Sequence, residues 1–256
     1  PVTSIFRAGN VSSEPFFRYV RQNPDQFKQD YLMSVFEFER EPPLVIAAGL
    51  SGLIAEARAA GEFALPHSIM TIASMPRAGE FVVNATRSIK IDGTMVEDLT
   101  KAEFQTHRQI PAVTTFLRKY VPGFERCHVI DSAATVGVRE TRRIVGQYVL
   151  SQHDIMEERR FEDAVARNSF PMDIHGPEED PEGHTWNALP PGKWYEIPYR
   201  CLLPKAVENL IVTGRCVSAT HEALGSVRTM PCCMMMGQSA GAAAALSLSL
   251  NAEASA

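Results

Sequence analysis

The first third of the chain changes from helical to strand-like periodicity. Between residues 12 and 40 the spacing of Phe, Tyr, Val and Leu predicts one or two helices, interrupted by a proline. Residues 44–61 begin as an apolar run and continue as a helix, for which Gly61 is a suitable C-cap. Residues 68–74 and 80–91 alternate apolar and polar positions, and they predict two antiparallel strands joined by a turn.

The middle of the chain predicts a long helix followed by mixed elements. Thr100 and Glu103 have the spacing of a capping box, so a long helix is expected to begin there. Residues 129–138 predict a strand, and the alternating charges of 155–167 indicate a solvated helix. The stretch 173–198 is rich in Pro, Gly, Glu and His, which is typical of a long loop.

The last forty residues predict a buried strand at 208–216, a polar loop and an uncharged helix from Pro231 to Leu250. Proline suits the first helical position, because its missing N–H would have no partner there. The amides of Cys232 to Met234 would then be free donors at the positive end of the helix dipole. This helix start therefore suits an anion or an electron-rich oxygen, and it would lower the thiol pKa of Cys232 and Cys233.

The same helix exchanges bulky residues for small ones halfway along. Gly237, Ala240, Gly241 and Ala244 have the spacing of one helix face, which would let the backbone approach a sheet or another helix closely. A buried helix with nothing bound at its start remains an alternative interpretation of the pattern.

Polar side chains gather between the predicted strand and this helix, in "GRCVSATHEALGSVR". A connecting loop without a function seldom needs so many hydrogen-bonding groups. His221 could take a proton during a redox step, although a structural histidine is the alternative. Arg139 follows the uncharged "TVGV" and could hold a carboxylate, although with Arg142, Arg143 and Glu140 it could equally form a salt-bridged strand edge.

Composition narrows the class of protein. The 256 residues are 45% hydrophobic and 21% charged, as in a soluble globular protein. The net charge of -5 argues against a nucleic-acid or an anionic-membrane partner. No signal peptide is visible, and the five cysteines lack CxxC spacing, which indicates reduced thiols in a cytoplasmic protein and no metal site.

Two stretches resemble a known family. "GVRETRRIVGQYVLSQHDI" and "ENLIVTGRCVSATHEALGSVRTMPCCMMMGQSAGAAAAL" are similar to the C-terminal part of FAD-dependent oxidoreductases with a dinucleotide-binding flavin fold. The resemblance implies that the last helix begins beside the flavin pyrimidine ring. It further implies cofactor contacts at Gly214, Arg215, Ser218, Met230, Pro231 and Cys232, and it places Arg228 near the flavin or the substrate.

One motif of that family is missing. FAD-binding domains cradle the pyrophosphate in a G-x-G-x-x-G turn after the first strand. Residues 43–61 imitate the pattern, but Ala47 stands at the first glycine position and only Gly49 and Gly52 follow. Because the chain also begins at Pro1, we interpret it as a fragment or one member of a split pair that by itself binds FAD weakly or not at all.

These observations combine into one expectation. The fold class is α+β, with a substrate domain at 1–205 built on an antiparallel sheet, and with 206–256 as the closing segment of a Rossmann-type FAD-binding domain. The function is that of a flavoprotein oxidoreductase that takes hydride from a small organic substrate, in which Arg139, His221 and Arg228 act; a non-catalytic domain with a lost flavin site is the alternative. The expected partners are a missing FAD-binding half or a second copy.

Overall fold

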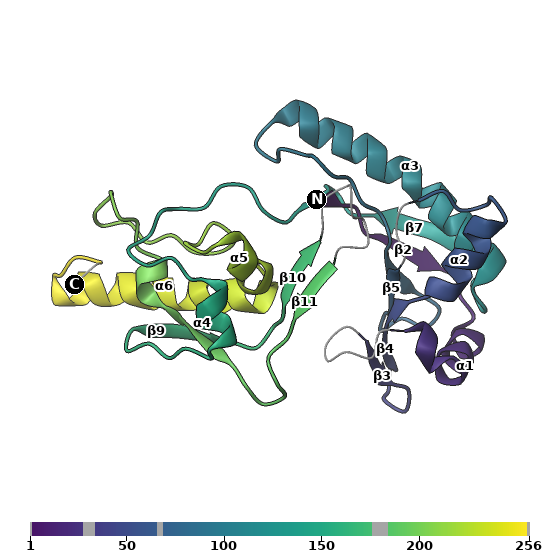
Figure 1. Cartoon of the computed structure of the whole chain (residues 1–256), viewed down its shortest axis with the longest axis horizontal. Helices are drawn as coiled ribbons and strands as arrows, with labels where there is room; N and C mark the ends of the chain where they lie inside the picture. Colours follow the sequence, from purple (N-terminus) through teal and green to yellow (C-terminus); the bar gives the residue numbers. More distant parts are fainter. Residues whose placement is uncertain (1, 28–33, 66–68, 176–183, 255–256) are drawn as a thin grey trace. The chain divides into compact units, whose positions relative to one another are not determined.

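The computed structural model describes residues 2–27, 34–65, 69–175 and 184–254 (Figure 1). These residues form two compact units, one up to Val138 and the other from Arg139 onward. Both units combine helices with antiparallel sheets, so the predicted α+β class is confirmed at that level. The predicted boundary between a substrate domain ending at residue 205 and a flavin-binding segment starting at residue 206 stays a prediction.

A six-stranded antiparallel sheet organises the first unit, in the order β3-β4-β5-β6-β2-β7. Its β5–β6 pair, in which Ile72 lies opposite Val83, confirms the predicted hairpin. A short pair of β1 (Val2–Thr3) and β8 (Gly137–Val138) lies apart from this sheet. The sheet strands are β2 (Phe6–Gly9), β3 (Val35–Glu37), β4 (Leu44–Gly49), β5 (Met70–Ser74), β6 (Phe81–Asn84) and β7 (His128–Ser132).

Aromatic packing holds helices onto this sheet. Phe16 lies 5.3 Å from Phe124 and 5.6 Å from Phe81 between ring centroids, both edge to face, a geometry that aromatic quadrupoles favour. All three rings are buried in one continuous core. The helical elements of this unit are α1 (Ser13–Gln22), the 3-10 turn η1 (Pro24–Gln26), α2 (Ser51–Ala59) and α3 (Val96–Tyr120).

The long helix α3 begins a turn earlier than predicted, so the capping box is wrong. Thr100 lies inside the helix, where its hydroxyl donates to the carbonyl oxygen of Val96 at 2.8 Å. Acidic residues Glu97 and Asp98 occupy the first turn, where the helix dipole favours negative charge. The carboxylate of Glu103 instead accepts the Val136 amide at 2.7 Å.

The second unit contains two separate two-stranded antiparallel pairs, β9–β12 and β10–β11. Its elements are α4 (Gln152–Met156), β9 (Ala164–Asn168), β10 (Met172–His175), β11 (His184–Asn187), β12 (Tyr195–Pro198), the 3-10 turn η2 (Tyr199–Cys201), α5 (His221–Val227) and α6 (Met230–Leu250). The predicted helix at 155–167 is therefore wrong in large part. The predicted loop at 173–198 instead contains strand residues of β10, β11 and β12, and its residues 176–183 lie outside the described part of the chain. Strands β9 and β12 pair across about thirty residues, which the local charge pattern did not reveal.

The predicted buried strand at 208–216 is also wrong. Leu210 is 43% exposed, and the Val212 amide donates to the Leu202 carbonyl at 2.8 Å. A buried strand needs neighbours that satisfy its backbone on both sides, and no described strand pairs with this segment. The described residues therefore contain no Rossmann-type strand here.

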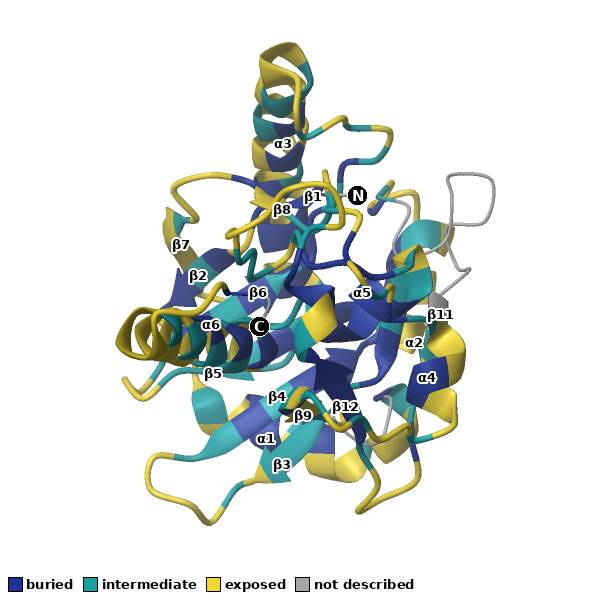
Figure 2. Ribbon diagram, turned by 90° about the vertical axis from the view of Figure 1, so that its left-hand side faces the viewer, coloured by how far each residue is buried: buried dark blue, intermediate teal, exposed yellow. Residues whose placement is uncertain are grey.

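The C-terminal helix α6 is confirmed, and it begins one residue before Pro231. Much of this helix is coloured as exposed in Figure 2, and Met234 and Leu248 are 71% and 85% exposed. A Cβ atom added at Gly237 or Gly241 would meet nothing within 4 Å, so the predicted close approach along this face is not found among the described residues. By length and composition α6 could also span a membrane, a criterion that core helices of soluble proteins meet as well.

This open space predicts the effect of Gly237→Ala. Alanine is the better helix former, so we expect the second unit to gain about 0.5–1 kcal/mol in its free energy of unfolding. Urea denaturation followed by tryptophan fluorescence reports on this unit, because Trp186 and Trp194 both belong to it. Gly192→Ala is the matched control: space is equally open there, but its φ of +81° makes alanine strained and destabilising.

Candidate functional site

His221 and Glu140 form a hydrogen-bonded pair in the second unit. His221 begins α5, which Thr220 caps by accepting the Ala223 amide at 3.3 Å. Its Nδ1 lies 2.7 Å from Oε2 of Glu140, and the other carboxylate oxygen binds Arg143. Glu140 thus connects α5 to the extended segment that follows β8.

This pair fixes the tautomer of the imidazole. A carboxylate only accepts hydrogen bonds, so Nδ1 of His221 carries the proton and Nε2 of the neutral ring is an acceptor. The side chain of His221 is 57% exposed, so Nε2 can reach a ligand or solvent. The proton-handling role predicted for His221 remains a prediction, but the residue is oriented for it. Glu140 was expected in a salt-bridged edge, and its bond to a histidine 81 residues away has no signal in a single sequence.

Ser218 joins the two segments that resemble the flavoenzyme family. Its hydroxyl accepts the Gly146 amide at 3.0 Å, and its carbonyl accepts the Leu150 amide at 3.1 Å. A Cβ atom on Gly146 would lie 2.7 Å from Cβ of Ser218, so only glycine permits this approach. Ser218 is buried, and its hydroxyl is engaged within the protein. Its predicted contact with a cofactor remains a prediction.

Gly214 and Arg215 lie near the start of α6. Gly214 has a φ of +90°, a backbone conformation that glycine adopts readily, and it forms a turn with Val217. Burial raises the pKa of the Cys233 thiol, and the neighbouring Arg215 guanidinium opposes that increase. Arg215 is therefore close to the first turn of α6, and its contact with a cofactor remains a prediction.

Fewer free amides stand at this helix start than the sequence predicts. The Cys233 amide donates to the carbonyl of Thr229 at 2.9 Å. Pro231 has no N–H. The amides of the first turn that have no acceptor within the helix are therefore those of Met230 and Cys232. No acceptor for these two amides is found in the described parts of the chain. No acidic side chain occupies the first turn either, so the positive end of α6 is not neutralised locally.

The predicted lowering of the cysteine pKa values is wrong. Burial raises the pKa of Cys232 to about 12, and that of Cys233 is raised as well. The Cys232 side chain is packed in the hydrocarbon core beneath the helix rather than at its open end. Loss of solvation is the largest cause of the increase for this thiol.

Arg228 is held by Asp173 of β10. Its Nη2 donates to the Asp173 carboxylate at 2.8 Å and to the Asp173 carbonyl at 3.1 Å, and each side chain is 17% exposed. Gly225 permits this contact, since an added Cβ would lie 3.1 Å from the Asp173 carbonyl oxygen. An anionic ligand of Arg228 would therefore compete with Asp173. Arg139 is partly buried directly after β8, and roles in substrate binding stay predictions for both arginines.

The strand–turn–helix that imitates a dinucleotide-binding motif is filled by the chain itself. The carbonyl of Gln26 accepts the Leu50 amide at 2.9 Å, and its side-chain oxygen accepts the Gly52 amide at 2.8 Å. Added Cβ atoms at Gly49 and Gly52 would lie 2.1 Å and 2.4 Å from oxygen atoms of Gln26. Strand β4 also lies in an antiparallel sheet, unlike the parallel strand of that motif. Gln26 therefore occupies the positions where a pyrophosphate would bind.

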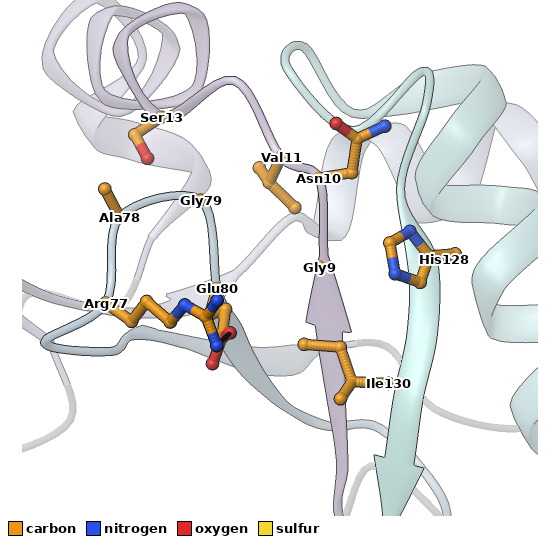
Figure 3. A pocket seen from close by; sticks show the side chains of 10 residues that line it. All are labelled: Gly9, Asn10, Val11, Ser13, Arg77, Ala78, Gly79, Glu80, His128 and Ile130. Carbon is orange, nitrogen blue, oxygen red and sulfur yellow. Dashed lines mark ion pairs between the residues drawn. The ribbon is translucent and has the colours of Figure 1, made fainter.

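A surface hollow of about 760 Å³ lies in the first unit, beside the start of α1 (Figure 3). Arg77, Glu80 and His128 supply its charged and titratable side chains. The Glu80 carboxylate pairs with Arg77 at 3.2 Å and with Arg7 at 3.5 Å, so its charge is already compensated. None of the residues predicted to contact the cofactor or substrate lines this hollow.

Comparison with known proteins identifies the family. A family model described as FAD dependent oxidoreductase matches residues 1–255, which is almost the whole chain and more than the stretches that carry the resemblance. No curated protein and no solved structure was found to match it. The chain therefore belongs to the FAD-dependent oxidoreductase family, whose cofactor is FAD.

Proposed function

We propose that this chain is the part of an FAD-dependent oxidoreductase that closes the flavin site and handles a proton while hydride leaves a small organic substrate. The observation that carries this proposal is the connection between His221 and the start of α6. Both lie in the second unit, in the segments that resemble the family.

A short series of contacts makes this connection. Glu140 binds His221, and four residues later the Ile144 amide donates to the Cys216 carbonyl at 2.9 Å. Arg215, next to Cys216, acts electrostatically on Cys233 in the first turn of α6. An acid–base pair, a guanidinium and a helix N-terminus are thus linked through adjacent segments, which is the set of groups that a redox site for an anionic or carbonyl substrate requires.

Each group has a defined task in this proposal. FAD, when bound, supplies the hydride acceptor. The amides of Met230 and Cys232 bind an electron-rich oxygen at the positive end of α6. Nε2 of His221 accepts the substrate proton, and Glu140 stabilises the resulting imidazolium. Arg215 supports negative charge near the same helix start.

A second polypeptide segment that carries the pyrophosphate loop completes this site in our proposal. Two observations support it: Gln26 fills the turn that imitates the loop, and α6 exposes an uncharged apolar surface over much of its length. Exposed apolar surface of this extent is typical of an interface. A flavin-binding half that packs on α6 would cover it and would place the pyrophosphate loop.

Flavin content of the purified protein tests this proposal. We expect the chain alone to be colourless after purification and the chain joined to or co-expressed with a G-x-G-x-x-G-containing half to hold FAD, measured by absorbance and by fluorescence quenching. Stoichiometric flavin in the chain alone would contradict the missing half. A colourless complex with a correctly folded partner would favour the alternative, a non-catalytic domain with a lost flavin site.

A further inference from the structure

A serine, a histidine and a glutamate lie together in the first unit, apart from the residues of the flavin proposal. Nε2 of His107 is 3.1 Å from Oγ of Ser132, at the end of β7. Nδ1 of His107 is 2.8 Å from the Glu103 carbonyl oxygen and 3.4 Å from Oε2 of the Glu103 carboxylate. One turn of α3 thus presents the imidazole to a hydroxyl on the neighbouring strand.

The backbone settles the tautomer of this imidazole. Carbonyl and carboxylate oxygens only accept hydrogen bonds, so Nδ1 of His107 carries the proton. In the neutral ring Nε2 is then the acceptor, and the Ser132 hydroxyl donates to it. Glu103 is itself held in place, because its other carboxylate oxygen accepts the Val136 amide at 2.7 Å. This is the order of roles that activates a serine nucleophile: hydroxyl, base and orienting carboxylate.

We propose that Ser132 is an acyl-accepting nucleophile and that this cluster hydrolyses small activated esters. Oγ of Ser132 attacks the ester carbonyl carbon while Nε2 of His107 takes the hydroxyl proton, and the C–O bond to the leaving alcohol breaks as the alcohol regains that proton. Water then attacks the acyl-serine while Nε2 of His107 takes a proton from that water, and His107 gives this proton to Oγ of Ser132 as the carboxylic acid leaves. The net reaction consumes one ester and one water, without any redox change.

The surroundings of Ser132 define the substrate class. The side chain of His107 is 46% exposed, so a ligand reaches the cluster from solvent. The amides of Ala134 and Thr135, in the exposed bend after Ser132, have no acceptor within the described part of the chain. They follow Ser132 closely in sequence, and in this proposal they donate hydrogen bonds to the oxyanion. Because the imidazole is this exposed, a small ester with a good leaving group suits the site best.

Hydrolysis of p-nitrophenyl acetate by the whole chain tests this proposal. We expect release of p-nitrophenol, and we expect peptide mass spectrometry of the quenched reaction to find the acetyl group on Ser132. Ser132→Ala and His107→Gln should each lower the rate by at least about 100-fold, since general-base catalysis contributes about 10²–10⁴-fold. Melting curves of both variants show whether the fold is intact.

Two control variants separate this activity from background chemistry. His153→Gln removes another exposed imidazole. Its rate shows how much uncatalysed acyl transfer to surface histidines contributes. Ser249→Ala removes an exposed serine whose hydroxyl donates to the Leu246 carbonyl of its own helix. Both should retain the full rate. Acetylation at histidines alone, or a Ser132→Ala variant as active as the wild type, would overturn the proposal, whether or not the chain binds flavin.

Discussion

Replacement of Gly49 by alanine is expected to destabilise the first unit by at least about 3 kcal/mol, more than overpacking usually costs. The new Cβ would lie 2.1 Å from the Gln26 carbonyl oxygen and 2.7 Å from Cα of Phe27. These are backbone atoms, so no rotamer change relieves the clash. The same backbone accepts the Leu50 amide at 2.9 Å, and a shift that makes room for the methyl group would break that bond.

Circular dichroism and tryptophan fluorescence together locate this effect. Circular dichroism reports on both units, whereas Trp186 and Trp194 report only on the second. We expect Gly49→Ala to lower the thermal transition seen by circular dichroism by roughly 10 °C and to change the fluorescence transition much less. A variant within about 1 kcal/mol of the wild type would show that Gln26 does not approach Gly49 as closely in solution.

Replacement of Asp154 by asparagine is expected to cost the second unit about 2–3 kcal/mol at neutral pH, the value of a charged hydrogen-bonded group lost from a buried position. Asp154 is 2% exposed, and its carboxylate accepts four hydrogen bonds of 2.8–2.9 Å. The donors are Tyr148, Arg159 and both the amide and the hydroxyl of Ser151. An asparagine would turn an NH₂ group toward some of these donors and leave them unpaired.

The effect of Asp154 depends on pH with a definite sign. Burial alone would raise the pKa of this carboxyl group, but its hydrogen bonds outweigh burial and hold the pKa below its ordinary value of 3.8. A lowered folded-state pKa stabilises the fold at pH values above 3.8, and this stabilisation is lost as the pH falls further through the folded-state pKa. The difference between wild type and Asp154→Asn should therefore be constant near neutral pH and shrink below about pH 4.

Urea denaturation at several pH values measures this difference, and Glu158→Gln is a suitable control. Glu158 forms one exposed ion pair with Lys193 at 3.0 Å, so its loss should cost less than about 1 kcal/mol at any pH. A cost for Asp154→Asn that stayed unchanged down to strongly acidic pH would show that the carboxylate charge is not what stabilises this network.

Local patterns predicted some elements of this fold well. The alternation around residues 70–84 and the proline-led helix α6 were identified because each depends on neighbours close in sequence. The β9–β12 pair was missed, because the preference of each strand for β structure depends on its contacts with the other strand. The strand predicted at 208–216 failed for the opposite reason: its sequence suits a buried strand, but no described strand pairs with it.

The candidate site shows the same division. The residue types around the start of α6 and the polar loop before it followed from the sequence and from the family resemblance. The partners of these residues did not: Glu140 binds His221, and Asp173 neutralises Arg228 from β10. Both contacts join segments more than fifty residues apart, and an isolated sequence contains no spacing rule for them.

The bare surface of α6 has a consequence for how cells handle this protein. An apolar helix of 21 residues without a charge is the kind of segment that chaperones retain and proteases degrade when nothing shields it. If a flavin-binding half covers this helix, as proposed above, a chain synthesised in excess over that half would be removed as an orphan. Its steady-state abundance should therefore follow the supply of that half rather than its own rate of synthesis.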